Sequence, residues 1–419
     1  MVEVWLPYGK TEVHISIPLR NLQVTLEPVG LDVPINNREL IKTSLTEPQG
    51  SESFTEIIKT GENIAIALDG TINHRICLSA LTAITEICTS EEASTEKISV
   101  YIGSGLRESS SADLIQAIRG SDTLKNINLL EQVGDRGELA DLGKTGNGTQ
   151  LMVNKAFSEA EYKVALGEVS VDAFSGLRGA QTTILPALSG STSIEQNRGL
   201  AFKGSVTLGE VEENNVHVDC MEAAEKVGVD LAVNLVTNGK GELTNAYSGG
   251  LKESWDAAYG DAHGMYKLEA ESNADVVIVS AGGRKYDYNL YNAIWALSSA
   301  RHVGHRSTSY ILLAECRDGL GADGLTKLAQ VESLAELRRR YMLGARAVYL
   351  LKQLTRRNEI HIVTALPTYL LEPLGVHVHR TANDALNRVY DRRNRGKKTT
   401  VITHGCSSIP YIPISEPSE

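Results

Sequence analysis

The sequence predicts an α/β protein made of two domains with largely parallel sheets. Apolar runs at residues 64–68 and 98–102 each end in a glycine-bearing loop, and each loop leads into a stretch that favours a helix. The apolar run at residues 275–279 restarts the same pattern in the second half of the chain. Alternating strands and helices are typical of a parallel sheet whose loops gather at the carboxyl ends of the strands.

Shorter elements precede and separate these runs. Residues 2–9 and 12–17 favour two strands joined by a glycine-containing hairpin, and residues 37–44 favour a short helix. Residues 162–166 form a further apolar run that predicts a buried strand, and residues 230–236 predict another.

The second half of the chain also contains apolar runs that predict strands. Residues 360–363 and 399–403 predict strands, and residues 261–266 suit a linker, so we expect domains at residues 1–265 and 266–419. His377 and His379 alternate on one face of a strand. Two histidines at that spacing could bind a metal, but without a third ligand in the sequence a polar strand face is favoured.

Composition narrows the class of protein. The chain has 419 residues, of which 42% are hydrophobic and 22% charged, with a formal net charge of -11. These fractions are those of a soluble globular protein, and the acidic balance argues against nucleic-acid binding. The short basic run at residues 392–398 is typical of a solvated helix end.

Targeting signals and metal motifs are not indicated. No apolar stretch approaches the length of about 18 residues that a membrane span needs, and the first residues show no signal-peptide pattern. The five cysteines are scattered and form no C-x-x-C motif. We therefore expect reduced, mostly buried cysteines, a cytoplasmic location, no membrane contact and no metal site.

The stretch at residues 167–198 abandons regular periodicity after the apolar run at residues 162–166. It carries Ser175, Gly176 and Gly179, and small residues at a strand end allow a backbone to approach a ligand closely. A tight structural connection between a strand and a helix explains the same pattern equally well.

This stretch also resembles the central segment of the nickel-dependent lactate racemase family, whose pattern is roughly G-x-x-x-x-H-x-x-x-G-F-S-G-G-x-K-x-x-L-P-G followed by N-H. The residues that keep this frame are Gly167, Gly176, Gly179, Leu185, Pro186 and Asn197. The resemblance puts Asp172 in the place of a catalytic histidine, Thr182 in the place of the lysine that tethers the nickel-pincer nucleotide, and Arg198 in the place of the nickel-ligating histidine.

Two earlier loops are similar to family loops as well. The first resembles D-H-T-R-P: Asp69 and Thr71 are kept, but Ile72 replaces the substrate-binding arginine, and Arg75 lies three positions further on. The second resembles T-G-x-H-R and keeps Ser104 and Gly105. Depending on the placement of one gap, Arg107 stands at the position of the family's other catalytic histidine or of the neighbouring arginine.

The second half of the chain resembles the family segment G-G-x-P-x-D-x-N-x-Y-Q-x-x-K. The residues it retains are Gly282, Gly283, Asp287, Asn289 and Tyr291. Asn292 replaces the glutamine of this segment, and Trp295 replaces its substrate-binding lysine. Together the matched motifs span nearly the whole chain in order, and they imply a lactate racemase-like fold with a cleft between the two domains.

The resemblance implies a 2-hydroxy-acid racemase that uses a nickel-pincer nucleotide, but the residues here contradict that chemistry. Histidine moves protons near neutral pH, whereas an ordinary Asp is ionised and Arg stays protonated. A guanidinium at Arg198 repels a metal cation, and Thr182 has no amine to tether a cofactor. We therefore expect that the nickel-pincer nucleotide is not used; the sequence leaves any other cofactor unknown.

Candidate site residues follow from these loops. The catalytic candidates are Asp172, Arg107 and Glu108, and the ligand-binding candidates are Asp69, Thr71, Arg75, Gly105, Arg178, Thr182, Arg198, Asn292 and Trp295. Arginines at strand ends suit a phosphate or carboxylate, so a small anionic metabolite or nucleotide is the expected partner. Salt bridges that pair these charges in a silent cleft are an equally good explanation.

Three functions stay open at this stage. The first is a family member that binds a small anion in the cleft without nickel-pincer racemisation. The second is a racemase or epimerase that uses the altered residues, which a raised pKa of Asp172 would favour. The third is a non-catalytic partner subunit. The sequence leaves homo- or hetero-oligomers open.

Overall fold

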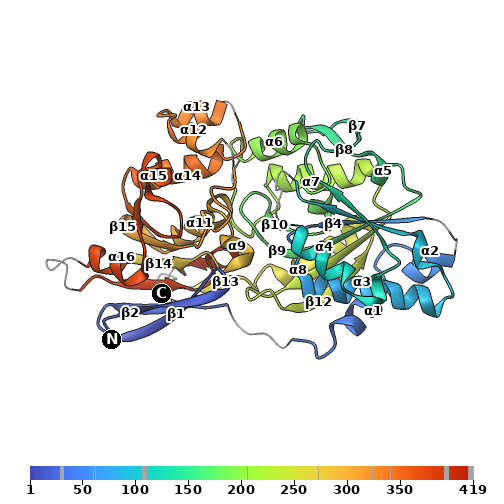
Figure 1. Cartoon of the computed structure of the whole chain (residues 1–419), viewed down its shortest axis with the longest axis horizontal. Helices are drawn as coiled ribbons and strands as arrows, with labels where there is room; N and C mark the ends of the chain where they lie inside the picture. Colours follow the sequence, from blue (N-terminus) through green and yellow to red (C-terminus); the bar gives the residue numbers. More distant parts are fainter. Residues whose placement is uncertain are drawn as a thin grey trace, which may run out of the picture. The chain divides into compact units, whose positions relative to one another are not determined.

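The computed structural model describes residues 1–28, 33–59, 61, 63–105, 111–204, 206–271, 273–322, 324–339, 341–390 and 396–413. The chain forms two compact units. Unit 1 combines Met1–Val29 with Tyr266–Glu419, and unit 2 comprises Gly30–Met265. Figure 1 shows strands and helices alternating along the chain in both.

Unit 2 is built on a sheet in the order β12-β11-β9-β4-β5-β6, with β10 pairing β9. The neighbours from β11 to β6 are parallel, whereas β12 and β10 are antiparallel to their partners. This sheet contains β4 (Ile64–Asp69), β5 (Ile98–Gly103), β6 (Asn128–Gln132), β9 (Tyr162–Asp172), β10 (Gly176–Arg178), β11 (Leu231–Thr237) and β12 (Leu243–Gly249). A separate antiparallel pair is formed by β7 (Leu139–Lys144) and β8 (Gln150–Asn154).

Helices cover both faces of the unit 2 sheet. They are α1 (Asn37–Thr46), α2 (Phe54–Lys59), α3 (His74–Ser90), α4 (Ala112–Arg119), α5 (Lys155–Ser158), α6 (Ser191–Leu200), α7 (Asn215–Val227) and α8 (Leu251–Ala262), with 3-10 turns η1 (Thr95–Lys97), η2 (Asp122–Leu124) and η3 (Ala180–Thr183). The helix α3 begins after Asn73, whose side chain accepts a hydrogen bond from the Arg75 N–H and caps the helix.

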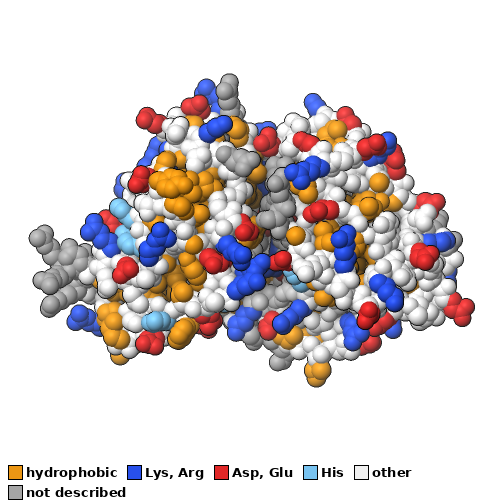
Figure 2. Space-filling model, in the orientation of Figure 1, with side chains coloured by type: hydrophobic (Ala, Val, Ile, Leu, Met, Phe, Trp, Pro, Cys, Tyr) orange, Lys and Arg blue, Asp and Glu red, His pale blue; other side chains and the backbone are white. Residues whose placement is uncertain are grey.

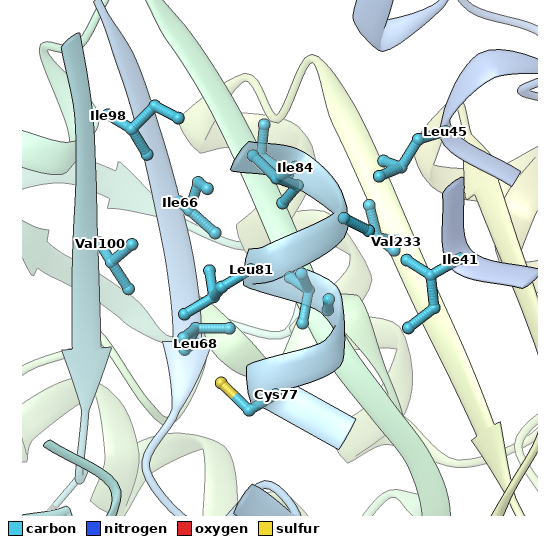
Figure 3. Packing of buried hydrophobic residues seen from close by; sticks show 14 of the residues in the cluster. Ile41, Leu45, Ile66, Leu68, Cys77, Leu81, Ile84, Ile98, Val100 and Val233 are labelled. Atoms are coloured by element: carbon cyan, nitrogen blue, oxygen red, sulfur yellow. The ribbon is translucent and has the colours of Figure 1, made fainter. Parts of the chain in front are cut away.

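The core of unit 2 lies between α3 and the strands. Leu81 and Ile84 of α3 point toward Ile66 of β4 and Val100 of β5, as Figure 3 shows. All four side chains are fully buried. Burying a large aliphatic side chain contributes about 1.5–3 kcal/mol relative to leaving it exposed, so this contact fixes α3 on the sheet. On the other face, small residues such as Ala165 and Ala232 pack against Ala180.

Unit 1 is built on a parallel sheet in the order β17-β16-β15-β14-β18-β3. Its strands are β3 (Leu22–Leu26), β14 (Ala274–Ser280), β15 (Gly304–Leu313), β16 (Glu359–Val363), β17 (His377–His379) and β18 (Thr399–Ile402). The hairpin of β1 (Val2–Tyr8) and β2 (Thr11–Ile17) is antiparallel, and β13 (Lys267–Glu269) pairs with β19 (Ile409–Tyr411).

The helices of unit 1 are short except for α14 and α16. They are α9 (Arg284–Asp287), α10 (Leu290–Ala293), α11 (Ala296–Ala300), α12 (Leu325–Ala329), α13 (Leu334–Arg339), α14 (Ala345–Thr355), α15 (Thr368–Leu371) and α16 (Ala382–Val389), with 3-10 turns η4 (Glu372–Leu374) and η5 (Gly405–Ser407). Leu6 and Ile15 of the hairpin pack with Leu386 of α16 against Ile278 and Ile311 of the sheet.

The N-terminal residues group differently from the expected domain at residues 1–265. Strand β3 forms the edge of the unit 1 sheet, where Leu26 pairs with Ile402 of β18. The hairpin β1–β2 also buries its apolar face in unit 1. The change of unit at Met265 and Tyr266 coincides with the expected linker. Both units have the predicted α/β class with largely parallel sheets.

The surface carries charges of both signs. Figure 2 shows acidic and basic side chains interspersed with hydrophobic ones over the face in view. Within the described part of the chain, no helix is long and apolar enough to cross a membrane. All five cysteines are free and buried.

Candidate functional site

The site begins with the hairpin of β9 and β10 in unit 2. The sequence predicted that the strand ends near Leu166, but β9 continues to Asp172 and β10 returns beside it, with Ser170 opposite Arg178. Parallel strands β4, β9 and β11 bring their carboxyl ends to the same edge. Side chains on the hairpin therefore join those of the β4 loop.

The glycines of the hairpin allow backbone segments of the same chain to pack closely. A Cβ atom at Gly167 would lie 2.3 Å from the carbonyl carbon of Gly179, so this residue lets two backbone segments touch. Gly176 has φ +79°, a left-handed conformation that favours glycine at the turn. Within the described residues the close approach is to the chain's own backbone, which matches the structural explanation of the small-residue stretch.

Arg178 forms the centre of the first polar group. Its Nε donates to Oγ of Ser170 at 2.7 Å, and its Nη1 donates to Oγ1 of Thr71 at 2.9 Å. Its Nη2 lies 3.8 Å from Oε2 of Glu168. Thr71 in turn donates its N–H and its hydroxyl to Oδ1 of Asp69, at 2.8 and 2.7 Å. The structure thus brings together Asp69, Thr71 and Arg178, three of the ligand-binding candidates.

Glu168 is the member of this group that sequence analysis missed. Its side chain is 2% exposed, and its carboxylate accepts the N–H of Asn73 at 3.0 Å and the hydroxyl of Thr237 at 3.1 Å. A buried carboxylate needs a positive partner, which Arg178 supplies. The available signal was an acidic residue inside an apolar strand.

Asp172 and Arg198 form the second polar group. Nη1 of Arg198 lies 3.7 Å from Oδ1 of Asp172, and its guanidinium lies over the Phe174 ring at 4.3 Å from the centroid. Oδ1 of Asp172 also accepts the N–H groups of Phe174 and Ser175, at 2.9 and 2.7 Å, and the Ser175 hydroxyl at 2.9 Å. These contacts hold the carboxylate at the turn between β9 and β10.

The pKa of Asp172 is lowered from its ordinary value. Burial alone would raise the pKa, but the Arg198 guanidinium and the donors of Ser175 and Phe174 outweigh it by stabilising the ionised form. A carboxylate with a lowered pKa is a weak proton acceptor at neutral pH. The shift therefore does not favour the racemase or epimerase hypothesis, which needs a raised pKa here.

Thr182 lies in a very small pocket. The pocket has a volume of about 10 Å³, and its lining includes Asp69, Ile72, Arg178 and Thr182. The Thr182 hydroxyl donates to the carbonyl oxygen of Gly179 at 2.7 Å. A pocket of this volume holds roughly one water molecule.

Several buried polar atoms of the segment from η3 to α6 lack hydrogen-bond partners in the described part of the chain. Among the described residues, no hydrogen-bond partner contacts either side-chain amide atom of Gln181, Oδ1 of Asn197 or Nη1 of Arg198. The other end of the Asn197 amide donates to Oδ2 of Asp219 at 2.9 Å, which ties α6 to α7. An unsatisfied buried polar atom costs about 1–3 kcal/mol, so these atoms mark a place for a bound polar group or water.

Two further unit 2 candidates lie outside this arrangement. Arg75 is exposed in the first turn of α3 and does not line the pocket. Gly105 has φ +58°, and its N–H donates to the Ala187 carbonyl oxygen at 3.2 Å. Its own carbonyl oxygen accepts the N–H of Gly134 at 2.6 Å, so the Gly105 backbone is engaged within unit 2.

The remaining candidates belong to unit 1 or fall outside the described residues. The N–H and side-chain amide of Asn292 donate to Oδ1 of Asn289, at 3.0 and 2.8 Å. The Trp295 ring packs edge-on against Tyr291 at 6.2 Å between centroids. Arg107 and Glu108 lie outside the described residues.

The site residues do not fit the nickel-pincer nucleotide that the resemblance implies. At the tether position, Thr182 offers a hydroxyl that is bonded to Gly179 and no amine. At the nickel-ligand position, Arg198 offers a cation. Within the described residues, no group of three His, Cys, Asp or Glu side chains is arranged to hold a metal ion.

Unit 1 contains a histidine cluster of which the sequence showed only two members. His361 of β16 lies between His377 and His379 of β17; its Nδ1 is 2.9 Å from Nε2 of His379, and its ring stacks on His377 at 5.0 Å. Burial lowers the pKa of His361 to about 4, and the neighbouring histidines act in the same direction. The register of two parallel strands, invisible in the sequence, creates this cluster.

Comparisons with known proteins agree with the motifs. Residues 8–208 match the family model of the lactate racemase N-terminal domain, and residues 269–410 match the lactate racemase C-terminal domain. The chain is 21% identical to a lactate racemase of Lactiplantibacillus plantarum, over 98% of this chain and 100% of that protein. It is 26% identical to a lactate racemase of Thermoanaerobacterium thermosaccharolyticum, over 77% of each.

Solved structures show the same fold. The apoprotein structure of lactate racemase from Thermoanaerobacterium thermosaccharolyticum superposes with a TM-score of 0.82 at 21% identity, covering 98% of this chain and 100% of that chain. A protein from Thermotoga maritima superposes with a TM-score of 0.66 at 11% identity, covering 90% and 98%. With both family models matched in order along the chain, this protein belongs to the lactate racemase family.

Proposed function

We propose that this member of the lactate racemase family does not carry out nickel-pincer racemisation and instead binds a small anionic metabolite. The ligand would contact the strand ends of unit 2 through Arg198. The expected cleft between the two domains, as the wider setting of this site, stays a prediction.

The observation that carries the proposal is the state of Arg198. Its side chain is 10% exposed, and Nη1 is 3.7 Å from Asp172, which is too far for a hydrogen bond. Among the described residues Nη1 has no hydrogen-bond partner. A carboxylate or phosphate oxygen is the acceptor that a guanidinium binds most strongly, and one oxygen at Nη1 would satisfy the orphaned donor.

The pocket beside Thr182 is not the place of the proposed ligand. Its volume is about 10 Å³, room for roughly one water molecule, and Arg198 is not among its described lining residues. A nucleotide needs much more room, since ligand pockets usually measure about 300–1,000 Å³. The nucleotide alternative therefore has no support from this pocket.

The loss of the family reaction is supported by the same residues. Two positions that the resemblance assigns to cofactor binding hold Thr182 and Arg198, and the position of a catalytic histidine holds Asp172. Asp172 pairs with Arg198 and accepts hydrogen bonds from Phe174 and Ser175, and its pKa is lowered. None of the three side chains supplies what a tether, a metal ligand or a neutral-pH base requires.

A non-catalytic role is the second candidate, because the charges of the site largely satisfy one another. Arg178 is engaged by Thr71, Ser170 and Glu168, and Arg198 faces Asp172. Such pairing stabilises the hairpin without any ligand. A protein with this role would bind no small anion and would act as a partner subunit.

The decisive experiment measures binding of L-lactate, D-lactate and inorganic phosphate by isothermal titration calorimetry. Arg198→Lys keeps the positive charge but loses the planar fork, so we expect affinity to fall by about tenfold or more. Arg75→Lys is the matched control, because Arg75 is exposed and does not line the pocket, and its affinity should stay within about twofold.

Chiral chromatography of lactate incubated with the protein tests the other half of the proposal. Racemisation of either enantiomer would refute the loss of the family reaction. Equal affinities of the native protein and Arg198→Lys would refute the assigned site. Absence of binding by all three anions would favour the partner-subunit role.

A further inference from the structure

A hollow lined by basic side chains lies in unit 1, and its described lining includes no residue of the proposed anion site. It has a volume of about 950 Å³. The side chains that matter for its charge and polarity are Arg356, Arg357, Arg388, Lys397, Glu359 and Ser307. We refer to it as the basic hollow.

Three short segments supply the cations of the basic hollow. Arg356 and Arg357 follow the end of α14, Arg388 lies in the last turn of α16, and Lys397 precedes β18. Glu359 opens β16, so the hollow lies at the amino ends of the strands. The carboxyl ends, where loops of α/β proteins usually bind ligands, lie at the opposite edge.

The charge of the basic hollow is strongly positive in an acidic protein. Among the described lining residues, four cations and one carboxylate leave a formal charge of +3, whereas the whole chain carries -11. The carboxyl ends of α14 and α16 contribute about -0.5 each through their helix dipoles. About two positive charges therefore remain beyond what the two helix ends neutralise.

The arginines of the basic hollow are not used in ion pairs with other described residues. Arg356, Arg357 and Arg388 are exposed, and no salt bridge within the described ranges includes them. Lys397 donates to the Val389 carbonyl oxygen at 3.3 Å and lies within electrostatic reach of Asp275. Three guanidinium groups thus offer donors in the fork geometry that binds phosphate oxygens in pairs.

We propose that the basic hollow binds a ligand that carries a diphosphate group. A single phosphate would fill only a small part of a 950 Å³ hollow, whereas a diphosphate spreads its charge toward cations from all three segments. Arginine matches the planar arrangement of phosphate oxygens, so the hollow should prefer diphosphate over a dicarboxylate of equal charge.

The test is isothermal titration calorimetry of the full chain with pyrophosphate, inorganic phosphate and malonate. We expect pyrophosphate to bind at least about tenfold more tightly than the other two, with an affinity that falls as sodium chloride is raised. The combined change Arg356→Ala, Arg357→Ala and Arg388→Ala should weaken pyrophosphate binding by about tenfold or more.

The matched control changes Arg339→Ala and Arg380→Ala, which are exposed arginines of unit 1 outside the hollow. The control should bind pyrophosphate like the native protein, and circular dichroism should show that both variants are folded. Arg198→Lys should also leave pyrophosphate binding unchanged, which separates this proposal from the proposed function.

Three results would overturn the proposal. One is no pyrophosphate binding at millimolar concentration. Another is equal binding of pyrophosphate and malonate, which would reduce the hollow to a nonspecific positive surface. The third is an equal loss of affinity in the control variant, or no loss in the variant of Arg356, Arg357 and Arg388.

Discussion

At Asp172, burial and hydrogen bonding act on the carboxyl group in opposite directions, and the ionised form is favoured. The residue stands where the family resemblance places a catalytic histidine, yet its contacts are those of a structural carboxylate. Oδ1 accepts three hydrogen bonds from Phe174 and Ser175 and faces Arg198. These contacts hold the turn between β9 and β10 in place.

The contacts of Asp172 predict that Asp172→Asn lowers the stability of the fold. At pH 7 the variant loses the charge that faces Arg198, and we expect the free energy of unfolding to fall by about 1–3 kcal/mol. Because the folded-state pKa of Asp172 is lowered, the native carboxylate contributes stability above its unfolded pKa and loses it as pH falls through the folded pKa. The difference between native and variant should thus shrink at low pH, as urea unfolding at pH 7 and pH 3 would measure.

The exposed Asp122→Asn provides the control for that comparison, and its stability should change by less than about 0.5 kcal/mol. Equal stability of Asp172→Asn and the native protein at pH 7 would mean that the Asp172 carboxylate does not stabilise the turn between β9 and β10.

His217 gives a second prediction at the same scale. It is 6% exposed, and its ring lies 4.9 Å from that of Trp255. Burial lowers its pKa to about 4. In the unfolded state His217 therefore binds a proton at higher pH than in the folded state. The contribution of His217 to the free energy of unfolding rises with pH between about 4 and 6.5 and is constant above about 6.5.

The expected size of this effect is on the order of 3 kcal/mol across the window. Urea unfolding of His217→Gln between pH 4 and pH 7 should show a shallower slope than the native protein. A native-like slope in the variant would assign the pH dependence to other groups, such as His361. If the native protein itself shows no slope, His217 is not buried in its neutral form.

Sequence analysis marked candidate site positions but not their partners. The family frame marked Asp172, Thr182 and Arg198 directly, since each stands at a position with a defined role. The ion pair of Asp172 with Arg198 and the burial of Glu168 depend on how β9, β10 and α6 meet. No local pattern contains that information, so the choice between an anion site and paired charges stayed open.

At the scale of elements, the small-residue stretch turns out to join two strands closely. The sequence predicted a buried strand at residues 162–166 only, because regular periodicity is lost from Gly167 onward. The strand β9 continues to Asp172 because the missing side chain lets the segment at Gly179 pack against it. Tertiary contact here overrides the local preference.

Gly167→Ala is therefore expected to be costly. Its Cβ would lie 2.3 Å from the Gly179 carbonyl carbon and 2.4 Å from the Ala180 nitrogen, and backbone atoms in a sheet cannot move aside easily. We expect a loss of about 1–3 kcal/mol in the free energy of unfolding, measured by urea denaturation.

Gly260→Ala is the matched control for that substitution. Gly260 lies in α8, and a Cβ there meets nothing within 4 Å. Alanine favours a helix over glycine by about 0.5–1 kcal/mol, so this variant should be more stable than the native protein. If Gly167→Ala leaves the free energy of unfolding unchanged while Gly260→Ala raises it, the backbone segments at Gly167 and Gly179 are not in close contact.

At the scale of the whole molecule, the N-terminal residues complete a unit that begins again at Tyr266. Strand β3 pairs with β18, and the hairpin β1–β2 covers an apolar face of the same sheet. Sequence analysis recognised the hairpin and the change at residue 265, but strand pairing across most of the chain leaves no local signal. The expected domain at residues 1–265 therefore differs from unit 2 in its first 29 residues.

This arrangement predicts the behaviour of fragments. A fragment of residues 266–419 lacks β3 and exposes the surface that Leu6, Ile15 and Ile17 bury, so it should aggregate or stay unfolded. Fusion of residues 1–28 to its N-terminus through a flexible linker should restore a folded domain. Dispersed amide signals in NMR spectra would report folding; a well-folded 266–419 fragment would contradict the role of the N-terminal segment.

We propose that this lactate racemase family member does not use nickel-pincer chemistry. Native mass spectrometry with nickel analysis of the protein purified from its source is the first measurement to make. We expect a chain without a nickel-containing nucleotide adduct, because Thr182 has no amine to tether the nucleotide and Arg198 cannot ligate its metal. Stoichiometric nickel together with a bound nucleotide mass would show that the chain retains the cofactor of its family.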